Sequence, residues 1–148
     1  MAKLWKKGRG KLGPFHPLIG AWVARADSPQ GPVTCRREFA RAAGTAVVTL
    51  TAVWEFGKTR YEELAVFAPG DDGVLAFWSF TADGKRSTGR LAEAPDLHPE
   101  AIAFEAQMPA GLARQAYWPD PEGGFCWVVE SRNKKGWKRF VEHHYRHA

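Results

Sequence analysis

Hydrophobic and polar residues alternate in short runs along most of this 148-residue chain. The clearest run covers residues 46–56, where Val48, Leu50 and Ala52 are separated by threonines. A period of two is typical of a β-strand with one buried face. Breaks rich in Pro, Gly and Asp separate the runs, and no stretch has the period and length of a long helix. The pattern therefore predicts an all-β protein.

Ten such runs fit the chain. They cover residues 19–26, 33–41, 46–56, 60–68, 74–81, 85–92, 101–107, 112–118, 125–131 and 137–146. Short turns join them, and Asp83-Gly84 is typical of a tight hairpin. Consecutive strands joined in this way form a meander, and closure into a barrel removes its exposed edges. We therefore expect a single up-and-down antiparallel β-barrel of about ten strands.

Positive charge is concentrated at the start of the chain. The net charge is +5, and five basic residues fall within residues 1–13, which contain no acidic residue. The remaining 16 basic residues balance the 16 acidic ones. This pattern predicts a flexible basic arm (residues 1–13) followed by a barrel domain (residues 14–148). So short an arm offers few phosphate contacts, so we expect no specific nucleic-acid partner.

The remaining composition bears on compartment and chemistry. No segment approaches the ~18 consecutive apolar residues of a membrane span. No apolar stretch follows the basic N-terminus, so we expect a cytoplasmic protein. Cys35 and Cys126 fall in predicted strands, which indicates buried, reduced thiols. The motifs of hydrolases, phosphate-binding loops and zinc proteases are absent from the sequence.

Gly20-Ala21-Trp22 opens the first run, and His16-Pro17-Leu18 precede it as a turn or single helical turn. In this the chain resembles the calycin superfamily, and its last segment resembles the ends of small lipocalin-like bacterial barrels of uncharacterised function. The resemblance implies a barrel floor closed by Trp22, with Arg139 or Arg146 lying across its ring. The lipocalin Thr-Asp-Tyr motif and the Arg-x-Tyr clamp of fatty-acid-binding proteins are absent, so the resemblance concerns fold more than function.

Tryptophans are the first candidates for a binding site. Five of the seven lie on predicted strands at positions that could face inward: Trp22, Trp54, Trp78, Trp118 and Trp127. They would line a cavity for a flat apolar ligand, or they would fill a barrel that has no cavity. Composition leaves both alternatives open.

Polar residues within the strand runs are the second candidates. The set comprises Tyr61, Glu63, Arg90, Glu105, Gln107, Gln115 and Glu130. Such side chains are costly to bury without partners, so we expect most of them at the surface. If Glu63 or Glu105 points inward together with Arg90 or Arg139, the interior gains a polar group that orients a ligand.

Histidines near the end of the chain are the third candidates. Strand alternation places His143 on one face with Trp137, Arg139, Val141 and Tyr145. This face is the more aromatic of the two, so we expect it to point inward. An inward His143 would be a haem ligand, as in haem-binding barrels of the superfamily, a general base, or a hydrogen-bonded histidine at the rim. On a strand His143 and His147 are roughly 13 Å apart, too far to share a metal ion. We therefore expect no metal site.

Together these observations predict a barrel that binds a small apolar or aromatic molecule. The candidate ligand-binding residues are Trp22, Trp54, Trp78, Arg90, Glu105, Arg139 and His143. We expect no cofactor other than the haem considered above, and the sequence leaves a homodimer open. One alternative is an enzyme that uses an inward carboxylate with His143 as an acid–base pair. Another is an interaction module with a filled barrel.

Overall fold

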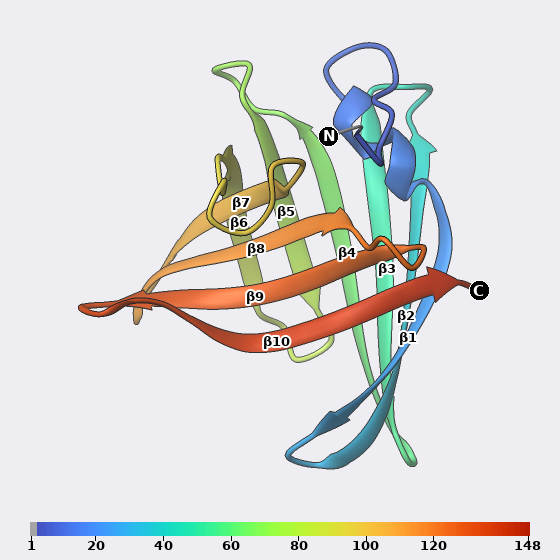
Figure 1. The fold of residues 1–148 in the computed structure, drawn as a ribbon, viewed down its shortest axis with the longest axis vertical. Coiled ribbons are helices and arrows are strands. Elements are labelled where there is room, and N and C mark those ends of the chain that lie inside the picture. Colours follow the sequence, from blue (N-terminus) through green and yellow to red (C-terminus); the bar gives the residue numbers. More distant parts are fainter. Residues whose placement is uncertain (1–2) are drawn as a thin grey trace.

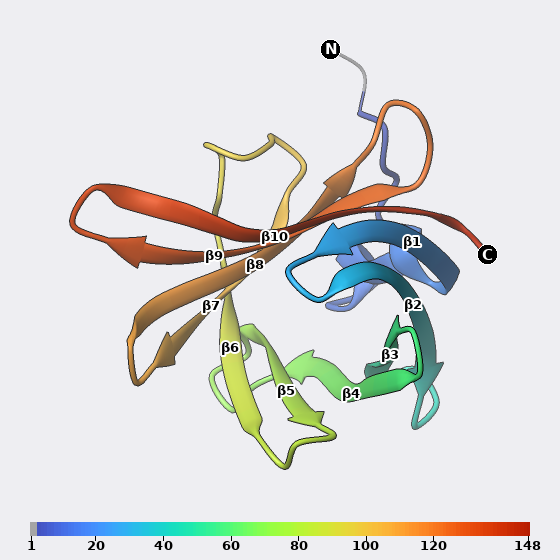
Figure 2. The same ribbon diagram turned by 90° about the horizontal axis from the view of Figure 1, so that it is seen from below.

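The computed structural model describes residues 3–148. Ten strands form one closed antiparallel barrel in chain order, with β1 beside β10 (Figures 1 and 2). They are β1 (Gly20–Ser28), β2 (Gly31–Ala42), β3 (Val47–Phe56), β4 (Thr59–Pro69), β5 (Leu75–Thr81), β6 (Arg86–Ala92), β7 (Ile102–Met108), β8 (Gly111–Pro119), β9 (Phe125–Asn133) and β10 (Gly136–His147). The all-β up-and-down barrel expected from the sequence is confirmed.

The single helical turn before the first strand is also confirmed. It is the 3-10 helix η1 (Gly13–Leu18), seen at the top of the barrel in Figure 1. Phe15 and Leu18 of η1 are fully buried, so this short helix closes one end of the barrel. In the part of the chain that the structure describes, no helix is long and apolar enough to cross a membrane.

Aromatic rings fill the interior next to η1. The rings of Phe15 and Phe67 are 4.7 Å apart, and Phe67 also contacts Phe77 and Phe104. Such packing leaves this end of the barrel filled by side chains, as in other small barrels. The opposite end carries the hairpin turns of β1–β2 and β3–β4, at the bottom of Figure 1.

Trp22 lies at the closed end, where its indole nitrogen donates a 2.7 Å hydrogen bond to the Leu18 carbonyl. The ring that stacks on it belongs to His147, with centroids 4.1 Å apart. The expectation that Arg139 or Arg146 lies across Trp22 is therefore wrong. Both arginines are engaged in ion pairs with acidic residues elsewhere.

A second apolar cluster lies outside the barrel. The loop between β6 and β7 contributes Ala94, which is buried against Ala103, Ala116 and Val128 of the strands below. This loop thereby covers the outer face of β7–β9. The outward side chains Ala103, Ala116 and Val128 are consequently buried and not exposed to solvent.

The N-terminal residues lie against the same loop. The Glu100 carboxylate accepts hydrogen bonds of 3.0 Å from the backbone N–H groups of Leu4 and Trp5. Leu12 is buried in the main core. The division into an arm (residues 1–13) and a barrel domain (residues 14–148) stays a prediction. These contacts hold residues 4, 5 and 12 against the barrel and its β6–β7 loop.

Candidate functional site

A buried arginine occupies the middle of the barrel. β2 alternates between inward and outward residues, and its inward side chains include Cys35, Arg37 and Phe39. Arg37 is only 2% exposed. Arginine is almost never fully buried unless its charge is paired. The surroundings of Arg37 therefore define the candidate site.

Three aromatic residues from distant strands hold the Arg37 guanidinium. Its Nε donates to the Tyr145 hydroxyl at 3.1 Å, and its Nη1 donates to the Tyr117 hydroxyl at 2.8 Å. The guanidinium carbon lies 3.9 Å from the centre of the Trp127 ring, which is cation–π geometry. Nη2 is buried and has no hydrogen-bond partner among the described residues.

Glu63 on β4 contributes negative charge to the surroundings of Arg37. Its carboxylate accepts a short hydrogen bond from the Ser79 hydroxyl on β5. Glu63 acts on Arg37 through its charge, but the two side chains form no ion pair within the described chain. Glu63 thus balances the charge of the site without occupying Nη2.

Burial and charge set the protonation of these groups. Burial alone would lower the pKa of Arg37, but the two phenols and Glu63 raise that pKa above its ordinary value. The guanidinium is therefore charged. Burial raises the pKa of Tyr145 to about 12 and that of the Cys35 thiol to about 11, so both stay protonated near neutral pH.

His143 points inward, as the strand alternation predicted. Its Nδ1 lies 3.2 Å from the Tyr145 hydroxyl, and its ring centre lies 5.4 Å from that of Trp127. Burial, followed by the nearby Arg37 charge, lowers the pKa of His143 to about 4. The imidazole is therefore neutral at pH 7.

The site combines one free charged donor with aromatic walls. Toward the end of the barrel opposite η1, Trp54, Phe56, Val129 and Val141 are half-buried and pack on the main core. Such an arrangement can bind an apolar group that ends in a carboxylate or another strong acceptor. The hydrogen bonds of Glu63 and His143 go to Ser79 and Tyr145, so these two residues do not form a direct acid–base pair.

Only part of the site expected from the sequence comes together here. Trp54 lies 5.8 Å from the Arg37 guanidinium, and His143 lies beside Trp127. Trp22 is inside the barrel but at its closed end. The ligand-binding roles of these three residues stay predictions.

Trp78, Arg90 and Glu105 lie on the outer face, contrary to the inward orientation considered for them. Trp78 is 39% exposed, because Phe77 and Ser79 take the inward positions of β5. Arg90 and Glu105 are cross-strand neighbours on β6 and β7, and Arg90 forms an exposed ion pair with Asp72. The outward Trp118 likewise packs on the second apolar cluster.

Arg139 lies outside for a different reason. The register between β9 and β10 shifts between Arg139 and Val141, which marks a β-bulge. A bulge inserts one extra residue, so the side chains before it change faces. Val141, His143 and Tyr145 point inward, whereas Arg139 pairs with Glu130 on the outer face.

Sequence reasoning missed Arg37, Tyr117 and Tyr145. A signal for Arg37 was present, because it alternates with Cys35 and Phe39 in one strand run. Period-two alternation places all three on one face. The partners on β8 and β10 are 80 and 108 residues away, so their contacts carry no local signal.

Three grooves lie on other parts of the described surface, and the last of them reaches Glu63. One of about 670 Å³ separates the N-terminal residues from the β6–β7 loop, one of about 680 Å³ adjoins residues 8–12, and one of about 400 Å³ borders Glu63 and Phe80. Arg37 and His143 line none of them.

Neither a family model nor a curated protein sequence matches this chain.

Proposed function

We propose that the barrel binds a small apolar or aromatic molecule whose acidic or carbonyl group is held by Arg37. The observation that carries this proposal is Nη2 of Arg37, a charged donor that is buried without a partner. An unpaired buried polar group costs free energy. A ligand oxygen at this position would remove that cost, which gives the site a reason to bind an acceptor.

The surrounding side chains support an apolar body for the ligand. Trp54 and Trp127 are 6.5 Å apart and flank Arg37, and the half-buried Phe56 and Tyr61 lie toward the end opposite η1. Burying apolar surface against them contributes about 25 cal/mol per Å². The apolar part would supply affinity, and Arg37 would supply orientation.

We further propose that the chain is a distant member of the calycin superfamily. Support comes from the closed up-and-down barrel, the short helix before β1, and Trp22 on the first strand at the closed end. The superfamily includes proteins that carry small apolar molecules. Membership would therefore agree with the proposed binding role.

Binding can be tested with a matched pair of probes. Dodecanoate and dodecanol share an apolar chain and differ in their charged group. Tryptophan fluorescence reports binding, because Trp54 and Trp127 adjoin the guanidinium. We expect dodecanoate to bind more tightly than dodecanol, and Arg37→Met to weaken dodecanoate binding by roughly 10-fold or more, as for a lost charged hydrogen bond.

Arg36→Met is the matched control, because Arg36 is the exposed neighbour on the outer face of the same strand. The dodecanoate affinity of Arg36→Met should equal that of the unaltered protein. Circular dichroism establishes that each variant keeps its strands. Absence of any response to either probe, or equal dodecanoate affinity in Arg37→Met, would overturn the proposal. An absorbance scan for a Soret band tests haem separately.

A further inference from the structure

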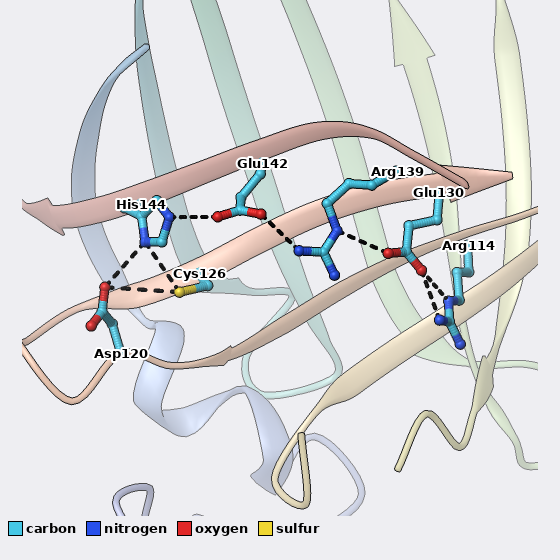
Figure 3. Close-up of polar contacts among 7 residues, drawn as sticks. All are labelled: Arg114, Asp120, Cys126, Glu130, Arg139, Glu142 and His144. Atoms are coloured by element: carbon cyan, nitrogen blue, oxygen red, sulfur yellow. Dashed lines mark hydrogen bonds and ion pairs between the residues drawn. The ribbon is translucent and has the colours of Figure 1, made fainter. Parts of the chain in front are cut away.

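Three potential metal ligands meet on the outside of the barrel, where the β8–β9 turn passes β10 (Figure 3). They are Asp120 Oδ2, Cys126 Sγ and His144 Nδ1, all within 4.8 Å of one another. Sγ lies 3.3 Å from Nδ1 and 3.8 Å from Oδ2, and Nδ1 lies 3.2 Å from Oδ2. The donor atoms therefore form a compact triangle.

Local structure sets each corner of this triangle. Cys126 and His144 are directly paired across β9 and β10, so their outward side chains are neighbours. Asp120 follows β8 in the adjoining turn. Its other carboxylate oxygen, Oδ1, accepts a 3.0 Å hydrogen bond from the Glu122 amide. That bond orients Oδ2 toward the cysteine and histidine.

The spacing fits a tetrahedral ion. Zinc binds nitrogen and oxygen at roughly 2.0–2.2 Å and sulfur at roughly 2.3 Å, which places tetrahedral ligand atoms roughly 3.3–3.6 Å apart. The three separations of 3.3, 3.8 and 3.2 Å bracket this range. Thiolate, imidazole and carboxylate are also the usual protein ligands of zinc.

We propose that Asp120, Cys126 and His144 bind a Zn²⁺ ion, with a water molecule as the fourth ligand. The His144 side chain is 47% exposed, so the ion reaches the site from solvent. Binding replaces the thiol proton of Cys126 with a Zn–S bond and releases that proton to water. The thiolate and the Asp120 carboxylate together neutralise the two charges of the ion.

A line of polar contacts behind His144 supports this geometry (Figure 3). Glu142 lies 2.9 Å from His144 Nε2, and Arg139 donates to Glu142 at 2.7 Å. A carboxylate on Nε2 orients the ring and directs the Nδ1 lone pair at the metal, as in many histidine–zinc sites. Glu142 is therefore a positioning residue.

Arg146 is the positive charge nearest the site. Its Nη2 lies 3.2 Å from Asp120 Oδ2 and 3.9 Å from the Glu122 carboxylate. Oδ2 has lone pairs for both the guanidinium and an ion, and Glu122 offers Arg146 a second partner. The ion and Arg146 thus share Asp120.

The spacing of these residues in the sequence does not predict the cluster, because its ligands come from a turn and two strands. Asp120, Cys126 and His144 match no common zinc motif. Only the register of β9 with β10 brings the last two together.

The test uses the full chain without an affinity tag, stripped of metal by a chelator. We expect one equivalent of Co²⁺ to give tetrahedral absorption together with a thiolate-to-cobalt charge-transfer band, and Zn²⁺ to displace it. Cys126→Ser should abolish the charge-transfer band. Cys126→Ser and His144→Gln should each weaken Zn²⁺ binding by more than roughly 100-fold, beyond the effect of losing a supporting residue.

Cys35→Ser and His16→Gln are the controls, because Cys35 is inside the barrel and the exposed His16 belongs to η1. Both variants should bind Co²⁺ and Zn²⁺ with the same affinity as the unaltered protein. No binding of Co²⁺ or Zn²⁺ at micromolar concentration would overturn the proposal. An unchanged Zn²⁺ affinity in Cys126→Ser and His144→Gln would also overturn it.

Glu142→Gln separates positioning from ligation. We expect Zn²⁺ affinity to fall by roughly 10-fold, the lower end of the effect of a supporting residue, while the charge-transfer band of the cobalt form is retained. A loss of Zn²⁺ affinity as large as that of His144→Gln would show that Glu142 is itself a ligand and not a positioning residue. That result would overturn the proposed arrangement.

Discussion

Gly124 shows how one residue allows the β8–β9 turn to lie against β10. Its φ is 70°, in the left-handed region that favours glycine. A Cβ placed there would lie 1.8 Å from the Tyr145 carbonyl oxygen. Both the backbone conformation and the close approach exclude a side chain. The position of Asp120 beside His144 therefore depends on Gly124.

We expect Gly124→Ala to lower the free energy of unfolding by about 2 kcal/mol or more, because strain and a backbone clash add. It should also weaken Zn²⁺ binding, since the turn must move away from β10. Urea unfolding and zinc titration measure the two effects. Gly123→Ala is the control, because Gly123 also has a positive φ but open space at its Cβ. Equal destabilisation by both substitutions would contradict this account.

The buried thiol of Cys35 makes the stability of the fold depend on pH in the alkaline range. Burial raises the pKa of its thiol from 9.0 to about 11. Between these values the unfolded chain loses the proton and the folded chain keeps it, so the stabilisation is complete below pH 9 and is lost as pH rises through 11. We expect a loss of up to about 3 kcal/mol from this group. Urea unfolding at several pH values should show that the free energy of unfolding falls more steeply above pH 9 in the unaltered protein than in Cys35→Ala. Parallel pH dependences of the two proteins would contradict this role of Cys35.

The outer face of β8–β10 carries a buried ion pair. The side chains of Arg114 and Glu130 are only 3% and 5% exposed, and Arg114 also pairs with Asp96 of the β6–β7 loop. Arg139 donates to the other carboxylate oxygen of Glu130 at 2.9 Å. Glu130 therefore ties β8, β9 and β10 together, as Figure 3 shows.

We expect Glu130→Gln to cost about 3 kcal/mol of stability, because it leaves Arg114 with less compensation in a buried site. The double variant Arg114→Met, Glu130→Leu should recover much of that loss, since an apolar pair carries no desolvation penalty. Urea unfolding of both variants measures the difference. A double variant less stable than the single one would contradict the explanation.

The ten strands could be predicted because alternation and turn residues are local signals. The direction of individual side chains was harder. In β5 the inward Leu75 and Phe77 alternate with the outward Trp78 and Phe80, so both faces are apolar and the pattern does not choose between them. In β10 the bulge before Val141 reverses the alternation, and no residue type marks it.

At the scale of the whole molecule, the two ends of the barrel differ in packing. Phe15 closes one end, with its ring 4.7 Å from Phe67 and 6.0 Å from Phe104. The other end has half-buried walls around Trp54. Hydrophobic content predicted a core of this size. It could not predict a charged guanidinium at the centre, because the hydroxyls that hold Arg37 come from strands remote in sequence.

We expect Phe15→Ala to lower the free energy of unfolding by about 3–5 kcal/mol, as for other fully buried phenylalanines. Phe140→Ala is the control, because Phe140 is 62% exposed and its loss should change stability by less than about 0.5 kcal/mol. Thermal or urea unfolding measures both. Comparable effects would show that η1 does not close the barrel.

The barrel joins its first and last strands at a short seam. β1 pairs with β10 through Trp22 with His147 and Val23 with Arg146, and the Ala148 amide donates to the Ala21 carbonyl. The neighbouring pair β1–β2 matches residues along all of β1. Transient opening should therefore begin between β1 and β10, so the amide of Ala148 should exchange with deuterium sooner than those in the middle of β3. Protection as strong at the seam as in β3 would mean that the cylinder opens elsewhere, or only when the whole chain unfolds.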